Sequence, residues 1–174
     1  MKVFIDAEFT NLNVYAKLIS MGFISQTGED LYVEFRGWDV VDCNKFVVET
    51  VLPLLDGSNP LLFVEACPHI AEWLLAFAED ITLIADSQYD WHFFQNIFHE
   101  RAQYVGQNCI DIYHLNQQIR VSFEWANFIE PPYNAIAGHA MQSHFLATGR
   151  QHHALEDARA LRKAWLDVER AKTL

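Results

Sequence analysis

Hydrophobic positions near the N-terminus predict three successive strands. Residues 3–5 (Val-Phe-Ile) form an unbroken apolar run, which is typical of a strand buried on both faces. Apolar runs over residues 16–25 and 31–35 predict two more strands, and the polar, glycine-containing segment 26–30 predicts a hairpin turn between them. Because short connections join antiparallel strands, we expect an antiparallel meander at the N-terminus.

Helical and extended patterns alternate after this meander. In chain order they predict a helix over 44–55, a helix over about 68–79 with Pro68 in its first turn, a strand over 81–85, a helix after Ser87, a strand around 105–112, and helices over 139–147 and 153–171. The segment 113–127 is ambiguous and admits a helix. This order predicts one α/β domain over residues 1–174, with a mixed β-sheet flanked by helices.

Two carboxylates follow the first apolar run. Asp6 and Glu8 are two residues apart, so in a strand their side chains project to the same side while Ala7 points to the other. Two like charges at the end of a buried strand need a proton, a basic partner or a metal ion. The nearest base in sequence, Lys17, lies beyond a turn and supplies no local partner. A solvated strand end is the alternative interpretation.

A third acidic position lies at the start of the helix after Ser87. Ser87 and Asp90 have the spacing of a capping box, which would explain Asp90 without any chemistry. Asp90 also shares a helical face with Phe93 and Phe94, so it points to the apolar side at a helix N-terminus, where the dipole favours a negative charge. An anion buried there could serve a metal ion. Asp86, at the preceding strand end, is a competing candidate.

The last predicted helix carries a fourth acidic position. Asp157 falls on its apolar row, whereas Glu156 aligns with Arg159 and Lys163 on the wetter face. An aspartate on the core face of a helix is rarely left without a partner, so we expect a special role for Asp157, with an ordinary buried salt bridge as the alternative. We expect His152 on the loop before this helix, able to turn toward whatever Asp157 binds.

Composition limits the classes of function. Of the 174 residues, 51% are hydrophobic and 14% aromatic, which fits a packed globular domain. The formal net charge of −11 argues against a protein that grips long duplex nucleic acid, but not against a metal enzyme that holds only a strand end. No apolar run approaches a membrane span, no signal-peptide pattern opens the chain, and three scattered cysteines fit a reducing cytosol, so we expect a cytoplasmic protein without a membrane partner.

The eight histidines raise the possibility of a zinc site, at His139 with His144 or at His152 with His153. No HExxH or paired Cys/His pattern is present, and no cysteine lies near these positions. We therefore expect surface or packing roles for His139 and His144.

In order and context, these motifs resemble the DEDDh family of 3′–5′ exonucleases, which have the ribonuclease H-like fold. The resemblance lies in residues 4–10 (first exonuclease motif), 18–24 (second strand), 85–90 (second motif, with Asp90 in the place of the conserved acid and Asp86 in that of a common asparagine) and 152–158 (third motif). It covers most of the chain, with 36–80 and 113–150 poorly matched. The compact chain is most similar to small stand-alone exoribonucleases of the ribonuclease T, oligoribonuclease and mycobacterial exoribonuclease AS types.

The resemblance implies two divalent cations, Mg²⁺ or Mn²⁺, bound by Asp6, Glu8, Asp90 and Asp157. Hard cations prefer oxygen ligands, and a pair of them stabilises the attacking and leaving oxygens of phosphodiester hydrolysis. By the family's arrangement, Asp6, Glu8 and Asp157 would hold one ion. Asp6 would bridge to the second ion, to which Asp90 contributes directly or through water.

The resemblance also implies the remaining roles in the site. His152 would be the general base that takes a proton from the attacking water. The residues after Glu8 contact the 3′-terminal nucleotide in the family, so Thr10 and Leu12 are candidate substrate contacts. Phe9 departs from the threonine that often follows this glutamate.

We therefore predict hydrolysis of RNA or short single strands from the 3′ end. The alternatives are a DNA proofreading or repair exonuclease of the same family, and a non-catalytic module that binds nucleic acid or protein. The acidic balance and the lack of an extra domain favour RNA, and the presence of all five candidate residues favours catalysis. An aromatic-rich segment could supply a homodimer surface or belong to the core: Phe123, Trp125, Phe128, Pro131, Pro132 and Tyr133.

Overall fold

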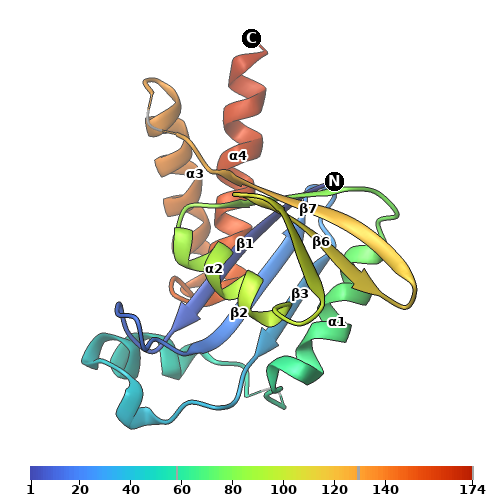
Figure 1. Ribbon diagram of the computed structural model, residues 1–174. Coiled ribbons are helices and arrows are strands. Elements are labelled where there is room, and N and C mark those ends of the chain that lie inside the picture. Colours follow the sequence, from blue (N-terminus) through green and yellow to red (C-terminus); the bar gives the residue numbers. More distant parts are fainter. Residues whose placement is uncertain (58, 129, 174) are drawn as a thin grey trace.

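A computed structural model describes residues 1–57, 59–128 and 130–173, which form a seven-stranded mixed β-sheet with helices on both faces (Figure 1). The strands are β1 (Lys2–Phe9), β2 (Leu18–Ser25), β3 (Asp30–Glu34), β4 (Ile81–Ala85), β5 (Ala102–Gly106), β6 (Cys109–His114) and β7 (Gln117–Trp125). They lie in the order β3-β2-β1-β4-β7-β6-β5. The predicted α/β class, with a mixed sheet and flanking helices, is confirmed.

The N-terminal meander is also confirmed, since β1 pairs antiparallel with β2 and β2 with β3. The second strand begins at Leu18, two residues later than predicted, because residues 10–17 form a loop. The Thr10 amide closes this loop by donating to the Lys17 carbonyl at 2.9 Å. Every residue of β2 is buried, as expected for a strand covered on both faces.

The centre of the sheet is parallel, with β4 between β1 and β7. The strand predicted over 81–85 is confirmed as β4. A helix over 113–127 is wrong, because Ile119, Val121 and Phe123 alternate with more exposed residues and bury one face of β7.

Beyond β7, the strands β6 and β5 continue the sheet antiparallel. The single strand expected around 105–112 is wrong, because Gln107 and Asn108 form a turn that divides it into this hairpin.

Two pairs of helices cover the sheet (Figure 1). α1 (Phe63–Leu75) and α2 (Gln88–Ile97) pack on the face to which Val3 and Ile5 of β1 point. α4 (Ala154–Lys172) covers the opposite face, where it meets Phe4, and α3 (Tyr133–Thr148) packs on α4. The alternation of side chains along β1 thus divides the core into two halves.

Two predicted helices begin earlier than expected. α1 starts at Phe63, because the Glu65 carboxylate accepts a hydrogen bond from the Leu62 amide at 2.8 Å and stabilises this earlier start, so Pro68 lies inside the helix. α3 starts at Tyr133 and ends at Thr148, one residue beyond the predicted end, and is followed by Gly149, whose φ is 67°.

The helix predicted over 44–55 is replaced in part by short turns, because Pro53 removes a backbone donor. These turns are the π turn η2 (Val47–Val51) and the 3₁₀ turn η3 (Leu52–Leu54), preceded by the 3₁₀ turn η1 (Val40–Asp42).

The aromatic-rich segment divides between core and surface. Phe123 is buried and stacks on Trp91, with 5.4 Å between ring centroids, so the core interpretation is confirmed for this residue. Trp125 is 49% exposed, and a dimer surface there stays a prediction. Among the described helices, none has the length and apolar character needed to cross a bilayer.

Candidate active site

Five carboxylates meet near the carboxyl ends of the central strands β1 and β4. They come from β1, the residue after β4 and the first turns of α2 and α4. Asp6, Asp86 and Asp90 each place an oxygen within 4.8 Å of the others. A second group, Glu8, Asp157 and a ring nitrogen of His152, satisfies the same limit. The structure therefore brings together the five catalytic candidates predicted from the sequence, and Asp86 joins them.

The two β1 carboxylates face α4, on the same side as Phe4, while Ala7 packs in the core on the α1–α2 side. α4 comes very close to β2 at Gly22, the strand partner of Asp6. A Cβ atom on Gly22 would lie 2.4 Å from the Leu155 Cα, so only glycine allows this approach. Asp157, two residues along α4, is thereby placed beside the carboxylates of β1.

Asp90 reaches the cluster from the first turn of α2. The Ser87 Oγ caps this helix by accepting from the Tyr89 amide at 3.1 Å. Asp90 Oδ1 accepts instead from the Ala7 amide at 3.1 Å, which ties α2 to β1. Asp90 Oδ2 is buried and has no hydrogen-bond partner among the described residues. Burial, followed by the charge of Asp86, raises the pKa of Asp90 well above its ordinary value.

Asp157 holds the loop that carries His152. The His152 amide donates to both carboxylate oxygens of Asp157, at 3.2 and 3.1 Å. These bonds fix His152 in the left-handed region, with a φ of 71°, where a residue with a side chain is strained by about 1–3 kcal/mol. The expectation that His152 lies on the loop beside Asp157 agrees with this geometry.

Phe46 lies against the imidazole of His152, edge to face, with 5.0 Å between ring centroids. Burial lowers the pKa of His152 below its ordinary value, which favours the neutral imidazole that can accept a proton.

Burial and mutual repulsion raise the pKa values of the carboxylates. Burial is the largest cause for Asp6, followed by the charges of Asp90 and Asp157, and its pKa lies well above the ordinary range. Burial and the charge of Asp157 raise the pKa of Glu8 to about 8. Burial raises that of Asp157 to about 7. The main charges acting on this cluster are acidic, so its negative charge is uncompensated unless protons or cations bind.

The two candidate substrate contacts differ in their accessibility. Thr10 is 1% exposed, and its Oγ1 accepts from the Lys17 amide at 3.0 Å, so its side chain closes the 10–17 loop and is not free to contact a nucleotide. Leu12 is 70% exposed on the same loop. Phe9 packs against Tyr89 and Phe93, with 5.1 and 5.2 Å between ring centroids.

Glu156 is buried, although its helical position predicted a solvent-facing side chain. It is buried between His144, whose Nε2 is 2.8 Å from Oε2, and Arg159, whose Nη1 donates to Oε1 at 2.6 Å. That prediction is wrong because α3 covers this side of α4. His144, for which a surface or packing role was expected, instead lies within hydrogen-bonding distance of the buried Glu156. His153 is buried, with its ring stacked on Tyr32 at 4.5 Å.

Sequence reasoning missed Gly22 and Phe46. A glycine inside an apolar strand signals close backbone approach, so Gly22 could have been recognised. Phe46 belongs to a segment whose apolar pattern predicted a core helix, yet its side chain is 51% exposed beside His152.

No protein-family model matches this chain, and a search among curated proteins finds no match. The geometry of the cluster and the order of its motifs are therefore the basis for assigning a function.

Proposed function

We propose that this chain is a metal-dependent 3′–5′ exonuclease of the DEDDh type, with a ribonuclease H-like fold, that hydrolyses RNA or short single strands. One observation carries the proposal: Asp6 and Glu8, Asp90, and Asp157 with His152 converge although these three segments are far apart in the sequence. Buried acids that repel one another destabilise a fold. A chemical role accounts for this cost, and packing does not.

The cluster fits divalent cations. Asp90 Oδ2 is a buried acceptor without a hydrogen-bond partner among the described residues, and the pKa values of Glu8 and Asp157 are raised. Burial is the largest cause of both shifts, and a bound cation would favour the ionised carboxylates. Carboxylate oxygens suit Mg²⁺ or Mn²⁺. When bound, two such cations stabilise negative charge on the attacking and leaving oxygens of a phosphodiester.

Two ligand sets would hold these ions. Asp6, Asp86 and Asp90 form one, and Glu8 and Asp157, near His152, form the other. This grouping differs from the arrangement implied by the family resemblance, in which Asp6 joins Glu8 and Asp157. Asp6 still interacts electrostatically with the carboxylates of both sets, which suits a bridging position.

His152 would take the proton from the attacking water. Its lowered pKa favours the unprotonated imidazole, and the bonds from its amide to Asp157 hold it beside the carboxylates.

The proposed substrate is the 3′ end of a single strand, with RNA favoured over DNA. A chain with a net charge of −11 is poorly suited to hold a long duplex by its phosphates. A DNA exonuclease would use the same carboxylates, and a non-catalytic binding module would leave their repulsion without a purpose.

Matched RNA and DNA oligomers of one sequence test the proposal, each incubated with the protein in Mg²⁺, Mn²⁺ or EDTA. We expect stepwise shortening from the 3′ end that is faster on RNA and absent in EDTA. Faster shortening of the DNA would favour the repair-type alternative. No shortening, together with no heat of Mn²⁺ binding by calorimetry, would favour the non-catalytic module.

A further inference from the structure

We propose that Phe46 is a positioning residue, whose ring holds the His152 imidazole in the carboxylate cluster. The catalytic consequence rests on the proposed function, in which this imidazole takes the proton from the attacking water. The two rings meet edge to face, with 5.0 Å between their centroids and 86° between their planes. A ring nitrogen of the same imidazole lies within 4.8 Å of an oxygen of Glu8 and of Asp157. Phe46 therefore contacts the group that would move the proton.

The imidazole needs a support of this kind, because hydrogen bonds fix only the backbone of the residue. The His152 amide donates to both carboxylate oxygens of Asp157, which leaves the two side-chain torsions of the histidine unset. Within the described ranges, neither nitrogen of the ring has a hydrogen-bond partner. A general base is usually oriented by a carboxylate or carbonyl on its second ring nitrogen. Here the ring of Phe46 is the packing contact that can set the orientation.

The chain around Phe46 is anchored, so its ring can act as a fixed support. The next residue, Val47, is buried and packs with Ile19 of β2. Two residues before Phe46, the Asn44 amide donates to the Thr10 carbonyl at 3.0 Å, and Asn44 Oδ1 accepts from the Val47 amide at 3.0 Å. These contacts fix Phe46 relative to β2 and to the end of β1.

Further contacts join the segment that carries Phe46 to the loop before α4. Arg150 Nη2 donates to the Leu54 carbonyl at 2.7 Å and to Asp56 Oδ1 at 2.5 Å. On the other side of the imidazole, His153 Nε2 lies 3.6 Å from Asp56 Oδ2. The loop thus touches this segment both before and after the candidate base, which keeps the two rings in register.

The exposed side of the Phe46 ring admits another interpretation. The side chain is 51% exposed, so a nucleobase could stack on it. The contact that the structure records is with the imidazole, which favours positioning. A base contact would act on the strand directly, whereas positioning acts only through His152. The two interpretations therefore differ in a variant that lacks the imidazole.

The experiment is a double-mutant cycle between Phe46→Ala and His152→Ala, measured in Mn²⁺ on an RNA octamer. We expect Phe46→Ala to lower kcat about tenfold and to leave KM unchanged, because the imidazole spends less time in place. In the His152→Ala background, the same change should lower kcat by no more than about twofold. Phe46→Tyr keeps the aromatic ring and should restore most of the rate.

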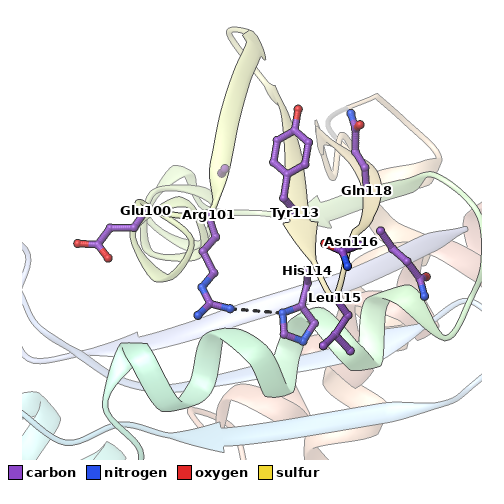
Figure 2. A pocket seen from close by; sticks show the side chains of 9 residues that line it. Glu100, Arg101, Tyr113, His114, Leu115, Asn116 and Gln118 are labelled. Atoms are coloured by element: carbon purple, nitrogen blue, oxygen red, sulfur yellow. Dashed lines mark hydrogen bonds between the residues drawn. The ribbon is translucent and has the colours of Figure 1, made fainter.

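Tyr113→Ala is the matched control, since it removes another partly exposed aromatic ring, 43% exposed. Tyr113 pairs with Gln118 at the start of β7, which runs parallel to β4, so it lies at the opposite end of the sheet from the cluster. Figure 2 shows it there beside a pocket that Arg101 and His114 also line. This variant should change neither kcat nor KM.

A measurement without substrate separates this inference from the proposed function. The Cε1–H signal of His152 in NMR spectra is identified by its absence from His152→Ala. Phe46→Ala should shift this signal, because the ring current of the neighbouring aromatic is lost, and Tyr113→Ala should leave it in place. A shifted signal in a protein that cleaves no substrate supports the positioning, and only the proposed function then fails.

Four results would overturn the positioning role. They are equal losses of kcat from Phe46→Ala in both backgrounds, a rise in KM with kcat unchanged, a Phe46→Tyr variant as slow as Phe46→Ala, and a His152 signal that Phe46→Ala does not shift. The rise in KM would assign the exposed ring to the substrate strand.

Discussion

Asp6 is in an unfavourable electrostatic environment, because burial and the carboxylates around it all raise its pKa. A residue kept in such a place stabilises the fold less than a neutral side chain would. Replacing such a carboxylate by a neutral side chain should therefore lower activity and raise the stability of the fold.

Asp6→Asn should abolish metal-dependent nuclease activity and raise the melting temperature of the metal-free protein. Removing one repelling charge should stabilise the fold by about 1–2 kcal/mol, or roughly 2–8 °C for a chain of this size. Activity in Mn²⁺ and thermal unfolding in EDTA measure the two effects. Glu49→Gln, at an exposed surface carboxylate, is the control and should change neither. Normal turnover by Asp6→Asn would refute the site.

His152→Ala should slow the chemical step by about 10²–10⁴-fold, the usual contribution of a general base. Calorimetric titration with Mn²⁺ should show an affinity close to that of the wild type. The titration is needed because a ring nitrogen of His152 lies as close to Glu8 and Asp157 as a ligand would. If affinity falls in parallel with rate, His152 is a metal ligand and not the base.

At the scale of elements, the local apolar pattern predicted those helices and strands whose formation depends on residues close in the sequence. β4 was predictable from an apolar run, and α4 from the apolar row on one face of its helical pattern. The hairpin of β5 and β6 and the strand β7 were not, because their register depends on pairing with partners far away in the sequence. The buried position of Glu156 was likewise hidden, since it requires α3 to pack on α4.

Gly22→Ala should displace the N-terminal turn of α4, because the added Cβ would lie 2.4 Å from backbone atoms of Leu155. We expect a loss of about 1–3 kcal/mol of stability and a larger loss of activity, since Asp157 moves with that turn. Gly138→Ala, in α3, is a matched control. Its Cβ would meet nothing within 4 Å, and alanine favours a helix by about 0.5–1 kcal/mol. Thermal unfolding and nuclease rates compare the two, and equal behaviour would contradict the role of Gly22.

At the scale of the whole molecule, the motif order was enough to predict that the carboxylates of Asp6, Glu8, Asp90 and Asp157 converge. It did not predict how these carboxylates divide between the two ligand sets. The joining of Asp86 to Asp6 and Asp90 depends on β1 and β4 running parallel and level with one another, which no single segment specifies.

The metal-free protein should lose stability as pH rises. Glu8 and Asp157 have folded-state pKa values of about 8 and about 7, against ordinary values of 4.5 and 3.8. The folded chain therefore holds more protons than the unfolded chain between these limits, and the stabilisation present below pH 4 is lost as pH rises through 7 and 8. Melting temperatures in EDTA should fall from pH 5 to pH 8.

Divalent cations should reverse this trend, because they bind the deprotonated carboxylates. Mg²⁺ or Mn²⁺ should raise the melting temperature more at pH 8 than at pH 5. The double variant Glu8→Gln, Asp157→Asn should show a flatter pH dependence in EDTA. A melting temperature that rises with pH in EDTA would contradict the expected protonation of the cluster.

The cluster can form only after α4 has been synthesised and has packed on β2 at Gly22. Asp6 leaves the ribosome early in synthesis, whereas His152 and Asp157 follow only after the whole sheet has been made. A nascent chain that still lacks α4 therefore holds the carboxylates of Asp6, Glu8, Asp86 and Asp90 without His152 and Asp157. On the proposed chemistry, such a chain is harmless to the transcript being translated until the final helix emerges.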